Sequence, residues 1–145
     1  MYHLLYLSSA RSLFSDEELI ELLSKSRKNN SERNITGILL YCDGAILQVL
    51  EGEKDVVEAL YARLLDDHRH HGIIQVIQGE SEDRFFGDWS MGFRKMTSSQ
   101  WDQLSGFIKP EDVIKPKDPG KISSQEVIVV IQSFVTANFS SRFIL

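Results

Sequence analysis

The segment from residue 35 to residue 52 constrains the fold more than any other part of the chain. It consists of two apolar runs that flank the dipeptide Asp43-Gly44. These residue types tolerate the backbone angles of a tight hairpin turn, so the segment predicts two antiparallel strands at the centre of a sheet. Strand alternation places Gln48 on the same face as the apolar residues two positions away on either side. A buried carboxamide without partners would cost about 1–3 kcal/mol, so we expect a hydrogen-bonding partner for Gln48.

A strand and a helix are predicted before this hairpin. Residues 3–8 are mostly apolar and predict a strand with Tyr6 at its middle. Ser15 and Glu18 have the spacing of a capping box, which marks the start of a helix. The inward face of that helix changes from apolar to polar along its length, through Leu22, Ser26, Asn29 and Asn30. The plain alternative is that Asn29-Asn30 is a helix end that enters a loop.

A second helix and two further strands are predicted after the hairpin. The apolar spacing of residues 55–65 predicts the helix. Arg63 and Asp67 lie four residues apart at its edge, the spacing of a surface ion pair. Residues 73–78 predict a fourth strand, and residues 89–93 predict a fifth. The resulting fold class is α+β, a ferredoxin-like βαββαβ order with an added fifth strand.

The chain is expected to divide into a domain of residues 1–96 and a helical C-terminal extension of residues 97–145. In the extension, apolar spacing predicts helices near residues 99–108 and 127–138. Ser123 and Glu126 form a second capping box before the latter. Because these helices carry much apolar surface, we expect them to pack on the open face of the sheet or at a subunit interface.

Composition argues against several partners. With 16 basic and 21 acidic residues, the formal net charge of −5 gives no electrostatic basis for binding nucleic acid or an anionic membrane. The first residues lack the pattern of a signal peptide, and no apolar run approaches the roughly 20 residues of a membrane span. Cys42 is the only cysteine, which excludes an internal disulfide. We therefore expect a cytoplasmic protein.

Enzymatic and metal chemistry also lack sequence support. The chain contains no Gly-x-Gly-x-x-Gly, no phosphate-binding loop, no Gly-x-Ser-x-Gly and no His-Glu-x-x-His. His68, His70 and His71 are clustered and suggest a metal site, but no second ligand group at suitable spacing accompanies them. A solvated loop is the alternative. We expect no bound metal and no enzymatic activity.

The first 95 or so residues resemble the BLUF family, blue-light receptors that use flavin, and the short, single-domain members in particular. The resemblance rests on the order and spacing of six segments. They are Leu5-Tyr6-Leu7-Ser8-Ser9, Ser26 with Asn29-Asn30, Asn34-Ile35-Thr36-Gly37-Ile38-Leu39, Leu47-Gln48-Val49-Leu50-Glu51-Gly52, Asp67 with Arg69-His70-His71, and Asp88-Trp89-Ser90-Met91.

The resemblance implies that the ring of FAD lies between the two helices, over the sheet. FMN or riboflavin could take its place. Leu22 and Leu64 would form apolar walls, and Asn30 would bond the pyrimidine edge with help from Arg63 and Asp67. The remaining implied flavin neighbours are Ser26, Asn29, His70 and Arg69, the last as a candidate for the flavin phosphate.

The resemblance also implies a mechanism. Tyr6 and Gln48 would form a hydrogen-bond chain to the flavin, and light would draw an electron and a proton from Tyr6. The amide of Gln48 would then be left rotated or tautomerised, which shifts the flavin absorption to the red. Met91 and Trp89 would relay the change to a separate partner protein. Apart from the resemblance, the apolar surface of the C-terminal extension leads us to expect a homo-oligomer.

Two other classes of function stay open. One is a flavin-free ferredoxin-like module for protein interaction, which a folded but colourless purified protein would favour. The other is a small metabolic enzyme that uses the histidines of residues 68–71, which metal analysis would reveal.

Overall fold

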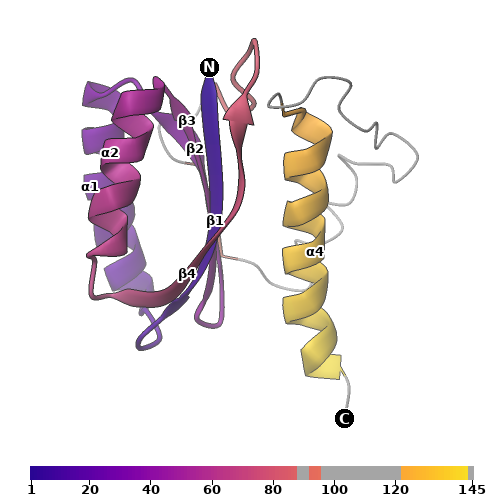
Figure 1. Cartoon of the computed structure of the whole chain (residues 1–145). Coiled ribbons are helices and arrows are strands. Elements are labelled where there is room, and N and C mark those ends of the chain that lie inside the picture. The colour runs from indigo at the N-terminus through magenta and orange to yellow at the C-terminus, as the bar shows by residue number, and fades with distance from the viewer. Residues whose placement is uncertain (88–91, 96–121, 144–145) are drawn as a thin grey trace.

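A computed structural model describes residues 1–87, 92–95 and 122–143 of the chain. It contains a mixed sheet between two helical layers (Figure 1). The elements are β1 (Tyr2–Ala10), α1 (Asp16–Glu32), β2 (Thr36–Cys42), β3 (Ala45–Gly52), α2 (Lys54–Leu65), β4 (His70–Glu80), β5 (Gly92–Lys95) and α4 (Ser124–Phe143). Trp89, Met91 and the helix predicted near residues 99–108 lie outside the described residues.

The sheet has the strand order β4-β1-β3-β2-β5. Neighbouring strands are antiparallel, except that β5 runs parallel to β2. Helices α1 and α2 cover one face, and α4 lies along the other (Figure 1). The predicted ferredoxin-like α+β fold with an added fifth strand is therefore confirmed.

The central hairpin forms as the sequence predicts. Asp43 and Gly44 both have positive φ, at 47° and 92°. Two successive positive φ angles match the right-handed twist of the flanking strands and allow the shortest connection. The hairpin thus makes β3 the middle strand, between β1 and β2.

Both predicted capping boxes are present. Ser15 accepts the backbone N–H of Glu18 at 3.1 Å, and the Glu18 carboxylate accepts the backbone N–H of Ser15 at 3.3 Å. Ser123 and Glu126 make the corresponding bonds before α4, at 3.4 and 3.0 Å. These bonds satisfy amide groups that the first helical turn leaves without intrahelical partners.

Side-chain alternation along the strands produces two separate cores. The core under α1 and α2 contains alternate residues of the central strands, including Leu4, Tyr6 and Leu50. The core on the opposite face contains the intervening residues together with Val127, Ile131 and Phe134 of α4. The central strands are thereby covered on both faces. The division of the chain at residue 96 stays a prediction.

The fourth strand is longer than the sequence predicts. It begins at His70 rather than residue 73, so part of the histidine cluster belongs to the sheet instead of a loop. The buried His70 ring is accommodated because both of its nitrogens have partners, the Ser8 hydroxyl at 2.9 Å and the Leu64 carbonyl at 2.6 Å.

Across the described ranges, no helix combines the length and apolar character needed to cross a membrane.

Candidate functional site

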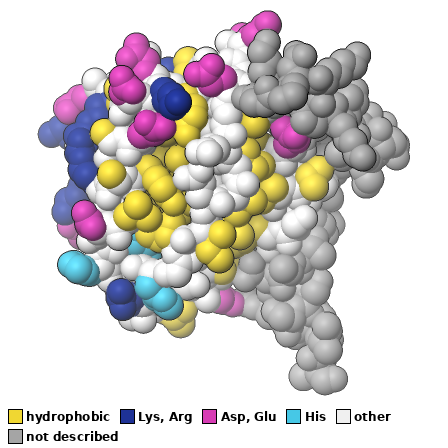
Figure 2. Space-filling model, viewed as in Figure 1, with side chains coloured by type: hydrophobic (Ala, Val, Ile, Leu, Met, Phe, Trp, Pro, Cys, Tyr) yellow, Lys and Arg dark blue, Asp and Glu magenta, His cyan; other side chains and the backbone are white. Residues whose placement is uncertain are grey.

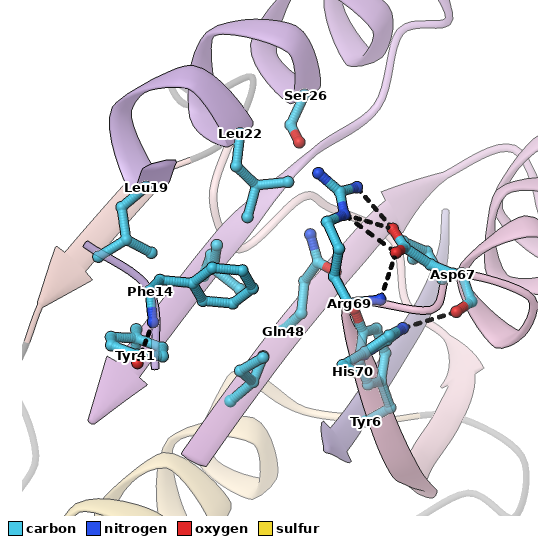
Figure 3. A pocket seen from close by; sticks show the side chains of 13 residues that line it. Tyr6, Phe14, Leu19, Leu22, Ser26, Tyr41, Gln48, Asp67, Arg69 and His70 are labelled. Carbon is cyan, nitrogen blue, oxygen red and sulfur yellow. Dashed lines mark hydrogen bonds and ion pairs between the residues drawn. The ribbon is translucent and has the colours of Figure 1, made fainter. Parts of the chain in front are cut away.

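A cavity opens between α1, the end of α2 and the sheet (Figure 3). Its walls are mainly apolar and come from both helices, the sheet and the loop before α1. The wall residues are Phe14, Leu19, Leu22, Leu39, Ile46 and Leu64. The free space between them is about 80 Å³. Polar side chains line the rest of the cavity, namely Tyr6, Ser26, Gln48, Asp67, Arg69 and His70.

A buried hydrogen bond lies in the sheet at one side of the cavity. Tyr6 on β1 and Gln48 on β3 are direct cross-strand partners, and the Tyr6 hydroxyl donates to Oε1 of Gln48. This bond gives Gln48 the partner that its buried position requires. Burial raises the pKa of Tyr6, and the nearby Asp67 carboxylate raises it further. The phenol therefore keeps its proton and remains a donor.

Asp67 and Arg69 form an ion pair at the edge of the cavity (Figure 3). The Arg69 guanidinium donates to both carboxylate oxygens of Asp67, at 3.0 Å from Nε to Oδ1 and 2.5 Å from Nη2 to Oδ2. The side-chain hydrogen bonds from Arg69 are the main cause that lowers the pKa of Asp67 to about 2. The cavity therefore presents a carboxylate and a cation side by side, and the side chain of the cation is 54% exposed.

The prediction of a surface ion pair between Arg63 and Asp67 is wrong. Helix α2 ends at Leu65, so Asp67 lies beyond the last helical turn and outside the reach of a helical i,i+4 pair. Asp67 pairs with Arg69 instead, and Arg63 is exposed.

His70 joins three elements beside the Tyr6–Gln48 pair. A carbonyl oxygen can only accept, so Nε2 donates to the Leu64 carbonyl, and Nδ1 forms a hydrogen bond with the Ser8 hydroxyl. The ring meets the Tyr6 ring edge-on, with 6.1 Å between centroids. This residue holds the end of α2 against β1 and fixes the width of the cavity there.

The predicted site residues divide into two groups. Eight of them line the cavity: Tyr6, Leu22, Ser26, Gln48, Leu64, Asp67, Arg69 and His70. Among the other predicted residues that the structure describes, Asn29, Asn30 and Arg63 are not part of this lining. Asn30 is buried near the end of α1, where its carbonyl accepts from the backbone N–H of Ile35 at 2.9 Å, whereas Asn29 and Arg63 are exposed. The cofactor-binding roles of all these residues stay predictions.

Sequence reasoning missed a pair of aromatic residues in the cavity. The backbone N–H of Phe14 donates to the Tyr41 hydroxyl at 3.0 Å, and the two rings pack with 5.6 Å between centroids. Tyr41 is buried and holds the loop before α1 against β2. Strand alternation from Leu39 could have placed Tyr41 on the cavity face.

A second, more open hollow of about 610 Å³ adjoins the cavity and shares Asp67 and His70 with it. Its other polar residues include Arg11, His68 and His71. Figure 2 shows histidine and basic side chains next to each other at the lower end of the molecule. Within residues 1–87, 92–95 and 122–143, no three or more His, Cys, Asp or Glu side chains are grouped so as to hold a metal ion.

The chemistry of this site suits a flat, largely apolar ring with hydrogen-bonding groups at its rim. Leucine side chains from α1 and α2 provide apolar surface on either side. The amide of Gln48 and the Asp67–Arg69 pair provide both donors and acceptors for a polar edge.

Comparison with known proteins agrees with a site for a flat, largely apolar ring. The family model "BLUF: Sensors of blue-light using FAD" matches residues 1–92. The photoactivated adenylate cyclase subunit alpha of Euglena gracilis is 29% identical over 140 residues, which cover 96% of this chain and 13% of the relative. The blue light- and temperature-regulated antirepressor BluF of Escherichia coli K12 is 30% identical over 88 residues, which cover 61% of this chain and 22% of the relative.

Two solved structures extend the comparison. A bacterial light-regulated adenylyl cyclase superposes with a TM-score of 0.65 and 27% identity, over 97% of this chain and 35% of that one. BlrB, a BLUF protein in its dark state, superposes with a TM-score of 0.68 and 24% identity, over 94% of this chain and 95% of that one. The chain thus matches BlrB over almost its full length but spans only about a third of the cyclase.

Proposed function

The chain belongs to the BLUF family of blue-light sensors that use FAD, and from this premise we propose that Tyr6 and Gln48 are its photoactive residues. The observation that carries the proposal is the buried hydrogen bond from Tyr6 to Gln48 beside the cavity. In this bond an oxidisable phenol contacts an amide whose donor and acceptor ends can exchange places. The two residues lie on adjacent strands and under the same two helices.

Eight cavity residues are proposed to hold the flavin ring. Leu22 and Leu64 would contact its two faces, since they line the cavity from opposite helices. Asp67 would meet its polar edge, and Arg69 would bond the flavin phosphate beyond that edge. We also propose Asn30 as a partner of that edge, because its carboxamide, 3% exposed at the end of α1, carries both donor and acceptor groups.

Binding would require the cavity to widen. Its free space of about 80 Å³ is far below the roughly 300–1,000 Å³ of a typical small-molecule pocket. The Arg69 side chain is 54% exposed and can turn toward solvent while the apolar walls stay in place. The adjoining hollow, with its arginine and histidines, would receive the phosphate-bearing tail. FAD and FMN would use this contact, whereas riboflavin would bind without it.

The signalling step is proposed to take place between Tyr6 and Gln48. When bound, the flavin absorbs blue light and becomes an oxidant that can take up an electron and a proton. Tyr6 supplies both, because its phenol is kept protonated by burial and already shares its proton with Oε1 of Gln48. After the electron and proton return to Tyr6, the Gln48 amide is left rotated or tautomerised, with donor and acceptor exchanged.

The output is proposed to pass to a separate partner protein in the cytoplasm. The sequence contains no dinucleotide-binding, phosphate-loop, serine-hydrolase or zinc-protease motif, so we propose that the chain has no enzymatic activity of its own. Trp89 and Met91, which lie between β4 and β5 in the sequence, are the proposed relay positions, and a homo-oligomer is the proposed assembly.

Absorption spectra of the purified protein test the function. They are recorded in the dark, directly after blue light and during recovery, with FAD added if the protein is colourless. A structured flavin band that shifts slightly to the red and returns in the dark is the expected result. A flavin band that bleaches would indicate another flavoprotein chemistry, and a folded protein that takes up no flavin would support the protein-interaction module.

A further inference from the structure

A second buried polar pair lies on the same two strands as Tyr6 and Gln48. His3 on β1 and Glu51 on β3 are cross-strand partners, three residues along each strand from the first pair. Their side chains, 1% and 0% exposed, approach to 3.2 Å between Nδ1 and Oε2. Because strand side chains alternate, an offset of three places this pair on the opposite face of the sheet, under the α4 layer.

The Glu51 carboxylate accepts hydrogen bonds from two other parts of the chain. The backbone N–H groups of Phe85 and Phe86 donate to it, each at 2.8 Å, and the Thr36 hydroxyl of β2 donates at 2.7 Å. Burial raises the pKa of Glu51, but the adjacent His3 ring and the hydrogen bonds from Thr36 and the two amides outweigh burial and lower it overall. The carboxylate is therefore ionised, and bonds to an ionised acceptor are the stronger kind.

Further contacts hold the segment of residues 81–87, which we call the crossover segment. The Arg84 guanidinium donates to the Asn34 carbonyl at 2.7 Å and to the Thr36 hydroxyl at 2.7 Å. The His3 ring stacks on Phe85 with 4.1 Å between centroids and bonds the Ser81 hydroxyl at 2.6 Å. The segment follows β4, which is one edge of the sheet, and leads toward β5 at the other edge.

We propose that Glu51 is a positioning residue that couples β3 at Gln48 to the crossover segment, so that a rearrangement at the cavity displaces the chain leading to β5. The coupling deepens the proposed function and rests on it. Apolar contacts allow neighbouring segments to slide, whereas several directional bonds to one buried carboxylate do not. A shift of β3 must therefore move the Phe85 and Phe86 amides with it or leave these part-buried donors without an acceptor.

Amide hydrogen exchange at Phe85 and Phe86 tests the coupling, in the dark and under blue light. Glu51→Gln replaces a carboxylate oxygen by an amide donor that opposes the donors around it. We expect exchange at these two amides to be about tenfold or more faster than in the wild type in the dark. Glu53→Gln makes the same chemical change at an exposed residue two positions away and should leave both amides unchanged.

Comparing exchange in the dark and under blue light distinguishes coupling through Glu51 from a merely structural role of this residue. In the wild type, we expect illumination to change exchange at Phe85 and Phe86, and in Glu51→Gln we expect the flavin red shift to persist while this change is lost. Unchanged dark exchange in Glu51→Gln would overturn the anchoring role. A wild type with an intact red shift but light-independent exchange would overturn the coupling alone, whereas a wild type without a red shift would overturn the proposed function itself.

A second variant covers the case in which Glu51→Gln does not fold. Arg84→Gln removes the bonds to Thr36, to Asn34 and to the backbone carbonyl of Glu51, but leaves the Glu51 carboxylate in place. We expect severalfold faster dark exchange at Phe85 and Phe86 and a weaker response to light. Exchange identical to the wild type under both conditions would contradict the proposal.

Discussion

At the residue scale, the photochemistry depends on one hydroxyl group. Tyr6→Phe keeps the ring and its burial but removes the donor to Gln48. We expect flavin binding to persist and the stable red-shifted state to be absent. Tyr2→Phe is the matched control, since Tyr2 lies on the same strand and in the same core but bonds Gln78 instead. Light-minus-dark absorption spectra measure both, and a normal red shift in Tyr6→Phe would contradict the mechanism.

A pH dependence also belongs to this scale. The pKa of Asp67 falls from 3.8 to about 2 on folding, so its ion pair with Arg69 contributes stability that is present above pH 3.8 and lost as the pH falls toward 2. The charged and titratable groups near the carboxylate are Arg69, His70 and Tyr6. Denaturant unfolding at several pH values should show a steeper loss of stability below pH 4 in the wild type than in Asp67→Asn.

The control for this measurement is Asp66→Asn, which changes the exposed neighbouring carboxylate. Its free energy of unfolding should fall between pH 4 and pH 2 as steeply as that of the wild type. Equal slopes for Asp67→Asn and the wild type would show that the ion pair does not contribute to folding.

At the element scale, β2 and β3 approach so closely that only glycine fits at position 37. A Cβ atom added to Gly37 would lie 1.9 Å from the Val49 carbonyl oxygen, which is backbone and cannot swing aside. We expect Gly37→Ala to lower the free energy of unfolding by about 1–3 kcal/mol or more. Gly87→Ala, whose added Cβ would make ordinary contacts from 3.5 Å, should change it little. Denaturant titration compares the two, and a fully stable Gly37→Ala would contradict this packing.

The elements themselves could be predicted because their signals are local. The turn at Asp43-Gly44 and the capping box at Ser15 each involve residues close in sequence, and strand alternation identified Gln48 as a buried amide that needs a partner. The end of α2 at residue 65 was also predicted, but the turn that follows it was not, and this turn pairs Asp67 with Arg69 instead of Arg63.

The polar network around Glu51 could not be predicted in this way. Its partners His3 and Phe85 lie far from it in the sequence, and only the sheet register brings them together. In sequence, a glutamate followed by glycine at the end of an apolar run marks the end of a strand and the start of a solvated turn. Its burial becomes visible only once the crossover segment is placed over the sheet.

At the scale of the whole molecule, α4 completes the second core. Ile131 is 3% exposed and packs among residues of β1, β2 and β3. We expect Ile131→Ala to lower the free energy of unfolding by about 2–5 kcal/mol. Ser133→Ala, at an exposed position on the same helix, should have little effect. Thermal and denaturant unfolding measure both, and equal stability of the two variants would mean that α4 does not pack on the sheet in solution.

The double covering of the sheet has a consequence for β3. Every residue from Ile46 to Gly52 is buried, because both faces of the strand are covered. A library of substitutions along this strand should therefore lose variants at every position, whereas a sheet with one wet face would tolerate changes at every second position. The tolerated changes in this molecule should lie instead on the outer surface of α1, spaced by the helical repeat.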